Sequence, residues 1–167
     1  MASNGRYVKI ATKIWADETM INLDPKEKLL FLYMLSCPHS NMAGYYRLPK
    51  PYIKADLQLS SKGLDKAFAK LLDKGLIKYC DKSSVVLIPN YFKYNKVQNN
   101  NQAKGVVNRT CEIPNNSLVK DYKKAIEQYA SRHKKVLGKG LPKGLDEEFV
   151  QGFGNTETDT ETDTETE

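Results

Sequence analysis

The order of the hydrophobic patterns between residues 25 and 92 constrains the fold of this chain more than any single motif does. Apolar residues spaced three to four apart indicate helices, whereas short runs rich in β-branched and aromatic residues indicate strands. In chain order the patterns predict a helix at 25–38, a strand at 44–48, helices at 51–59 and 61–74, and strands at 76–80 and 85–92. The sequence therefore predicts an α+β fold that is mainly helical.

The first of these helices has a clear start signal. Asp24 supplies an N-cap, Pro25 takes the first helical position, and Glu27 stands three residues after the cap. The helix that follows is apolar nearly all round, from Leu29 to Leu35. Because that pattern is typical of a buried helix, we expect this helix to form the centre of the core.

The helix at 61–74 is amphipathic instead. Gly75 follows it, where a helix end favours a positive φ, and its opposite face carries a row of lysines diluted by Asp65 and Asp73. We expect its apolar residues to pack on the first helix, against Leu30, Tyr33 and Met34. The residues predicted to face the core are Leu64, Phe68, Leu71 and Leu72.

This order of elements is that of a winged helix-turn-helix. In that architecture the third helix is presented outward as the recognition helix, and the loop between the last two strands, here residues 81–84, forms a small β-hairpin wing. Lysines and hydroxyls on such elements reach phosphates and base edges. The candidate DNA-binding residues are Lys50, Lys54, Ser60, Ser61, Lys62, Lys66, Lys70, Lys82 and Ser83.

The distribution of charge favours double-stranded DNA as the partner. The formal net charge is +6, but residues 155–167 hold six of the 20 acids and no base, so residues 1–154 carry +12. A lysine row opposite an apolar face is also typical of any solvated helix, and winged helices serve as protein-interaction modules as well. The alternatives are therefore a protein–protein adaptor or a transcriptional regulator of the same fold.

The rest of the chain divides into further segments beyond a winged-helix domain at 1–96. Residues 97–135 begin with a polar run that is either a linker or a short helix, and continue as an amphipathic helix capped by Ser117, with Leu118, Tyr122, Ile126 and Tyr129 inward. Residues 136–167 are predicted to be a flexible linker and a disordered acidic tail, because six Thr-acid dipeptides cannot bury apolar surface. That tail is expected to compete weakly with DNA or to aid solubility.

Other residues point away from catalysis and from cofactors. Three widely spaced cysteines and two histidines favour neither disulfides nor zinc, and we expect Cys37 and Cys80 to be buried as small apolar side chains. Trp15, at the end of a stretch that begins β-like, is expected to anchor core packing. No phosphate-binding glycine loop or nucleophile motif is present, so no enzyme is predicted. No membrane span or signal peptide is evident, and the expected location is cytoplasmic.

Several segments together carry a family resemblance: KIATKIWADE, KLLFLYMLSCPHSNMAGYYRLP, GLIKY, and VLIPNYFKYN followed by NQAKG. Over about residues 6 to 130 the chain resembles the N-terminal winged-helix domain of phage replication proteins and DnaD-type replisome organisers. The resemblance implies binding of origin DNA, self-association into a homo-oligomer, and contacts with other replication proteins such as a helicase loader. Longer relatives often continue into a second helical domain, whereas this sequence continues into its linker and acidic tail.

Overall fold

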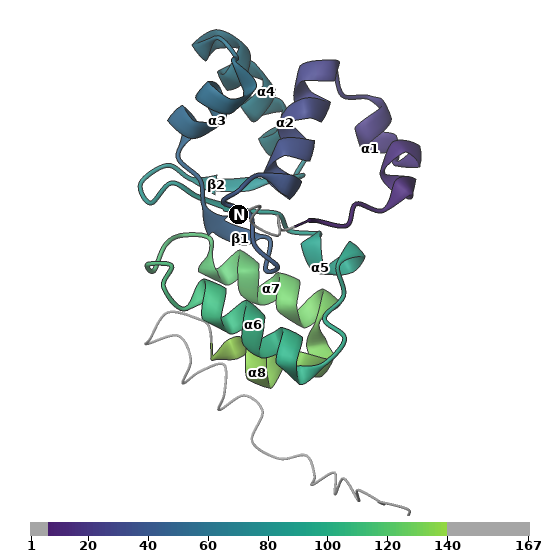
Figure 1. Ribbon diagram of the computed structural model, residues 1–167, viewed down its shortest axis with the longest axis vertical. Helices are drawn as coiled ribbons and strands as arrows, with labels where there is room; N and C mark the ends of the chain where they lie inside the picture. The colour runs from purple at the N-terminus through teal and green to yellow at the C-terminus, as the bar shows by residue number, and fades with distance from the viewer. Residues whose placement is uncertain (1–6, 140–167) are drawn as a thin grey trace, which may run out of the picture.

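A small three-stranded antiparallel sheet lies between two groups of helices in the computed structural model, which describes residues 7–139 (Figure 1). The fold is α+β and mainly helical, as the sequence predicted. The elements are η1 (Thr12–Ala16), α1 (Glu18–Ile21), α2 (Pro25–Ser36), β1 (Tyr45–Arg47), α3 (Lys50–Leu57), α4 (Ser61–Asp73), β2 (Lys78–Cys80), β3 (Val85–Leu87), α5 (Tyr91–Tyr94), α6 (Asn100–Thr110), α7 (Val119–Tyr129), η2 (Ser131–His133) and α8 (Lys134–Gly138).

Helix α2 begins where its capping signal predicts. The Asp24 carboxylate accepts a hydrogen bond from the Glu27 backbone N–H at 2.9 Å, and the Glu27 carboxylate accepts one from the Asp24 N–H at 2.9 Å. This reciprocal capping box satisfies two amide donors that the first turn leaves free. Leu30 and Met34 are fully buried, but Leu29 is 47% exposed. The expectation that α2 is buried all round is therefore wrong for its outer face.

Helix α4 packs on α2 through the face that its hydrophobic period predicts. Leu64, Phe68 and Leu71 are buried, and the Phe68 ring meets the Tyr79 ring edge-on at 5.0 Å. The prediction for Leu72 is wrong, because this side chain is 41% exposed. Leu72 follows Leu71 by about 100° around the helix, which turns it away from α2.

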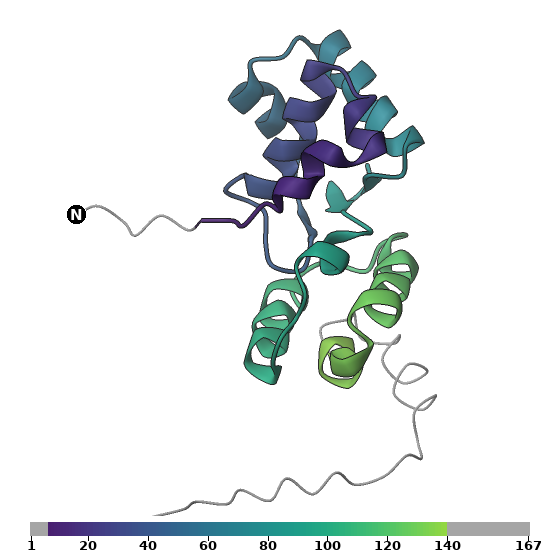
Figure 2. The same cartoon turned by 90° about the vertical axis from the view of Figure 1, so that its right-hand side faces the viewer.

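The sheet joins the two groups of helices. Strand β3 lies at its centre, in the order β1-β3-β2, and all three of its residues are buried. On β1, successive side chains point to opposite faces. The Tyr45 ring stacks on Tyr122 of α7 at 4.6 Å, whereas the Tyr46 hydroxyl donates a hydrogen bond to the Met34 carbonyl of α2. The view turned by 90° shows the same arrangement, with α1–α4 on one side of the sheet and α6–α8 on the other (Figure 2).

The helices beyond the sheet decide between two open alternatives and correct two expectations. The polar run after Tyr94 opens α6, capped by the Asn99 carboxamide, which accepts from the Gln102 N–H. Ser117 does not cap α7: the Leu118 N–H binds the Asn116 side chain instead. A flexible linker from residue 136 is wrong for 136–138, which end α8, because Leu137 is fully buried. Residues 140–167, including the predicted acidic tail, lie outside the described part of the chain.

Expectations near the N-terminus and in the hairpin also need correction. Trp15 is 60% exposed and lies in η1, which has no buried residue, so it does not anchor the core. The second hairpin strand ends at Leu87 rather than 92, because Pro89 lacks an amide donor and a turn leads into α5. Cys37 is buried as predicted, but Cys80 is only half-buried.

Two further observations concern residues 7–139 as a whole. No helix in this range has the length and apolar character needed to cross a bilayer. No group of three His, Cys, Asp or Glu residues in the same range is placed to hold a metal ion.

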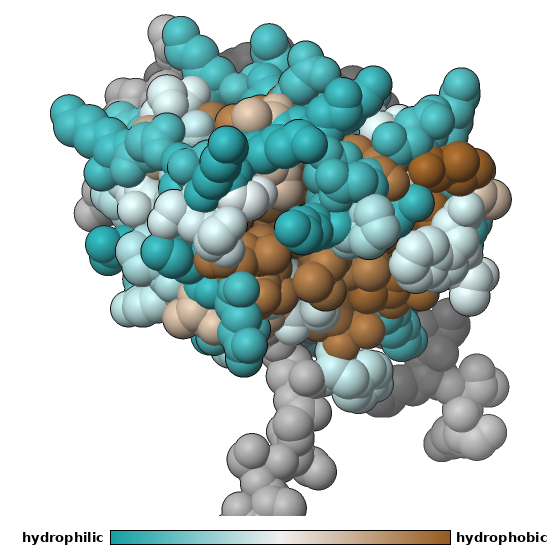
Figure 3. Space-filling model, turned by 90° about the horizontal axis from the view of Figure 1, so that it is seen from above, coloured by the Kyte–Doolittle hydropathy of each residue, from teal (hydrophilic) through white to brown (hydrophobic). Residues whose placement is uncertain are grey.

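Seen from above, over the end of the molecule that holds α1–α4, hydrophilic side chains cover most of the surface around one apolar area (Figure 3).

Candidate nucleic-acid interface

The end of α3 and the start of α4 gather four of the predicted site residues. Gln58 has φ 51°, a left-handed conformation that ends α3 and lets α4 begin at Ser61. The Ser60 hydroxyl accepts a hydrogen bond from the Gly63 N–H at 3.1 Å, and the Lys54 ammonium donates to the Ser61 hydroxyl at 2.8 Å. These groups, with the exposed Lys62, form a hydroxyl-rich, cationic end of α4. A helix N-terminus of this kind also favours anions through its free amides and dipole.

The lysine row on α4 does not meet one uniform environment. Lys66 and Lys70 line a surface hollow together with Asp24, Glu27 and Asp73, whereas Lys62 does not. The pKa of the Asp24 carboxyl is lowered, chiefly by its hydrogen bond from the Glu27 backbone and additionally by the charge of Lys66. Lys70 is half-buried, while Lys62 and Lys66 are exposed. Of the three lysines in the row, Lys62 at the N-terminal end of α4 is therefore the one whose charge is least offset by neighbouring acids.

Lys50 links α3 to the hairpin loop. Its ammonium lies 2.8 Å from the Asp81 carboxylate and sits over the Phe68 and Tyr79 rings, at 4.9 and 5.2 Å from their centroids. Lys50 thus has intramolecular partners on three sides, and its contact with DNA stays a prediction. The same contacts fix the hairpin loop to the start of α3.

The two predicted residues of the loop at 81–84 differ in accessibility. Lys82 is exposed, as a phosphate contact requires. Ser83 is half-buried and its hydroxyl oxygen is shielded from solvent. The expectation that the Ser83 hydroxyl faces DNA is therefore wrong, because the turn directs it inward; Ser84, the next residue, has φ 53°.

No family model, curated protein or solved structure matches this chain. The candidate site has a defined geometry of its own. That geometry brings together four of the predicted residues at the start of α4: Lys54, Ser60, Ser61 and Lys62. Lys82 is exposed on a separate loop. Of the others, Lys50 is ion-paired, and Lys70 and the Ser83 hydroxyl are partly or fully shielded from solvent.

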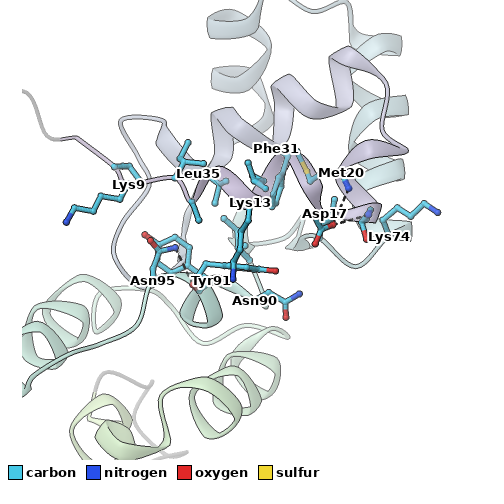
Figure 4. A pocket seen from close by; sticks show the side chains of 18 of the residues that line it. Lys9, Lys13, Asp17, Met20, Phe31, Leu35, Lys74, Asn90, Tyr91 and Asn95 are labelled. Carbon is cyan, nitrogen blue, oxygen red and sulfur yellow. Dashed lines mark hydrogen bonds between the residues drawn. The ribbon is translucent and has the colours of Figure 1, made fainter.

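A cavity of about 150 Å³ lies under the N-terminal segment, away from the start of α4 but next to its C-terminal end, where Lys74 and Gly75 line it (Figure 4). Met20 and Phe31 contribute apolar surface, and Tyr91, Asn90 and Asn95 close it from α5 and its flanks. Among the residues of 7–139 that line it, Asp17 is the one carboxylate, and it already accepts hydrogen bonds from the backbone N–H groups of Thr19 and Met20. The cavity therefore presents a mainly apolar pocket whose acid serves as a helix cap.

Sequence reasoning missed the cationic and aromatic side chains around this N-terminal segment. Lys13 and Lys93 both lie over the Tyr94 ring, at 5.1 and 5.4 Å from its centroid. The sequence signal for Lys93 and Tyr94 is the alternation of lysines with aromatic residues in YFKYNK, which falls at the end of the predicted strand 85–92 and at the start of the polar run predicted as a linker or a short helix.

Proposed function

We propose that this chain is a non-catalytic winged helix-turn-helix protein that binds double-stranded DNA through α4 and loop 81–84. We further propose that it acts at the start of DNA replication in a bacteriophage or a related bacterial system. The proposed footprint is centred on Lys54, Ser60, Ser61 and Lys62, with Lys66 and Lys82 on its edges.

The observation that carries the proposal is the way α4 is held. Its inner residues Leu64, Phe68 and Leu71 are buried against the core, so its outer face and its hydroxyl-rich start are presented rigidly to solvent. Its 13 residues span about 20 Å, and an α-helix with its side chains is about 10 to 12 Å in diameter, which suits a major groove about 12 Å wide.

Two more features support the winged-helix interpretation. The hairpin β2–β3 follows α4 directly and is held against β1, so its loop projects beside the start of α3. The charge of +12 on residues 1–154 favours a polyanionic partner. The replication setting rests on the resemblance of residues 6–130 to phage replication proteins and DnaD-type organisers.

The test is duplex binding by the full chain and by a triple variant, Lys62→Ala, Lys66→Ala and Lys82→Ala. Each lost phosphate contact should reduce the slope of log K against log salt by about 0.9. Binding is measured by fluorescence anisotropy over a range of salt concentrations, and folding is checked by circular dichroism.

A matched control removes the same charge elsewhere. Lys120→Ala, Lys124→Ala and Lys135→Ala change three exposed lysines of α7 and α8. This control should keep the wild-type slope. Equal losses in both triple variants would show that duplex binding is diffuse rather than centred on α4. Footprinting on the encoding genome then separates replication from transcriptional regulation by where the site lies.

A protein–protein adaptor is the second candidate, and one observation favours it. Ile21 of α1 and Leu29 of α2 are 57% and 47% exposed, so each offers apolar surface that a protein partner would cover. An adaptor would show no duplex binding at low salt, where the cationic surface attracts DNA most strongly.

A further inference from the structure

A groove distinct from the α4 surface is built by four segments that are distant in sequence. Its volume is about 630 Å³, and its walls come from residues 7–11, 40–42, 91–98 and part of α6. None of the predicted DNA-binding residues lines it. Whatever this groove binds therefore uses side chains other than those of the proposed duplex site.

The described lining of the groove is cationic. Lys9, Lys96 and Arg109 line it, and no Asp or Glu of residues 7–139 does. All three cations are exposed, and none of them forms an ion pair within the described residues. A concave surface lined by one sign of charge concentrates the field and favours a ligand that carries several negative charges.

The groove also offers aromatic surface. Tyr7 is 81% exposed and Tyr94 is 42% exposed, while Tyr91 lies deeper at 8%. An exposed tyrosine ring keeps apolar area in contact with water, which is unfavourable in free energy, so a ligand that covers the ring gains from the contact. Gln98 and Gln102 add side-chain amide N–H groups, which donate hydrogen bonds readily to base edges, whereas the Gln102 Oε1 already accepts from the Gln98 backbone N–H at 2.8 Å.

We propose that this groove binds single-stranded nucleic acid. The cations would follow the phosphates, and the Tyr7 ring would stack on an unpaired base, which is the combination that single-strand-binding surfaces use. Tyr94 already lies under the ammonium groups of Lys13 and Lys93, so it contributes to the cationic wall rather than to stacking. A duplex hides its base faces and gains nothing from the tyrosines. An acidic peptide would gain from the cations but would not require accessible ring faces, so the observations favour the nucleic acid.

The first test separates stacking from charge with one matched pair of variants. A fluorescently labelled oligothymidine of about ten nucleotides is titrated with the full-length protein and followed by anisotropy. Tyr7→Ala should weaken binding about tenfold, which corresponds to about 1.4 kcal/mol, whereas Tyr7→Phe should bind like the wild type. Tyr7 is so exposed that neither change should affect folding. Equal affinity of Tyr7→Ala and Tyr7→Phe would overturn stacking at this residue and, with it, the proposal.

The second test locates the charge. The triple variant Lys9→Ala, Lys96→Ala and Arg109→Ala should lower the salt slope by about 0.7 for each lost phosphate contact. The matched control is again Lys120→Ala, Lys124→Ala and Lys135→Ala, which should leave the slope unchanged. Equal losses in the two triple variants would overturn the groove as the binding site.

Further arms identify the ligand and separate this proposal from the duplex site. Oligouridine in place of oligothymidine distinguishes RNA from DNA, and binding of either supports the proposal. The variant Lys62→Ala with Lys66→Ala should keep full single-strand affinity even if duplex binding is lost. Binding of a peptide with the sequence LDEEFVQGF, residues 145–153, without binding of either oligonucleotide, would overturn the proposal in favour of a peptide groove.

Discussion

The outer face of α4 and the N-terminal groove are both cationic, but they differ in what surrounds the cations. On α4, acids stand among the lysines: Lys66 and Lys70 share a hollow with Asp24 and Asp73. In the groove, no acid of the described residues shares the lining with Lys9, Lys96 and Arg109, whereas tyrosines do. The comparison teaches that lysines of similar spacing or number can differ in how far nearby carboxylates offset their charge, which the sequence alone does not reveal.

The two surfaces also differ in how they are supported. The α4 surface is one face of a single helix whose other face is buried in the core, whereas the groove depends on the placement of four separate segments. A helix face is set by its own period, so it stays correct as long as the helix packs. The groove needs each of its segments in place, and it should be the more sensitive of the two to local change.

The largest expected effect tests the anchoring of α4. Leu71→Ala should lower the free energy of unfolding by about 2 to 5 kcal/mol, because Leu71 is fully buried and its truncation leaves a cavity. The adjacent Leu72→Ala removes the same atoms from a side chain that is 41% exposed and should cost less than about 1 kcal/mol. Urea denaturation of both variants measures the difference. Similar losses would mean that α4 is rotated from the register described above.

A smaller effect is expected within the lysine row. Lys62→Ala should lower the duplex salt slope by about 0.9, whereas Lys70→Ala should change it much less, because Lys70 is half-buried beside Asp24 and Asp73. The measurement is anisotropy at four or more salt concentrations for each single variant. A larger decrease in salt slope for Lys70→Ala than for Lys62→Ala would show that the duplex interface lies closer to the turn between α1 and α2.

The smallest expected effect concerns the two ion pairs of the described residues. Lys78–Asp121, at 2.7 Å, joins β2 to α7, and Lys50–Asp81, at 2.8 Å, joins α3 to the hairpin loop. Exposed pairs contribute about 0.2 to 1 kcal/mol, and the less exposed Asp121 places its pair toward the upper end. Double-mutant cycles with alanine give both coupling energies. A stronger coupling for Lys50–Asp81 would mark the loop as the more rigid of the two junctions.

Much of the fold could be predicted because its signals are local. The capping box of Asp24 and Glu27, the period of Leu64, Phe68 and Leu71, and Gly75 with φ 66° each act within a few residues. The wrong predictions concern residues whose burial depends on segments that are distant in sequence. Leu72 and Trp15 are apolar, yet no packed segment among residues 7–139 covers them, and Leu137 lies in a glycine-rich stretch but packs into the core.

The candidate site shows the same division. The sequence correctly predicted that the Lys62, Lys66 and Lys70 spacing falls on the outer side of α4, since that is set by the helix period. It could not predict that Asp24 lies beside Lys66, that Asp81 pairs with Lys50, or that the Ser83 hydroxyl turns inward. The groove was missed altogether, because its residues are unremarkable until the chain brings residues 7–11 against α5 and α6.

Adjacent tyrosines on β1 have a consequence for cooperativity. Tyr45 stacks on α7 while Tyr46 is bonded to α2, so neighbouring residues of a three-residue strand hold the two helical groups. Because β1 has only three residues, separating it from α1–α4 also disturbs its contacts with α6–α8. The two groups should therefore open and close as a single unit rather than as independent foldons. A ligand that stabilises either surface then slows the local opening of both.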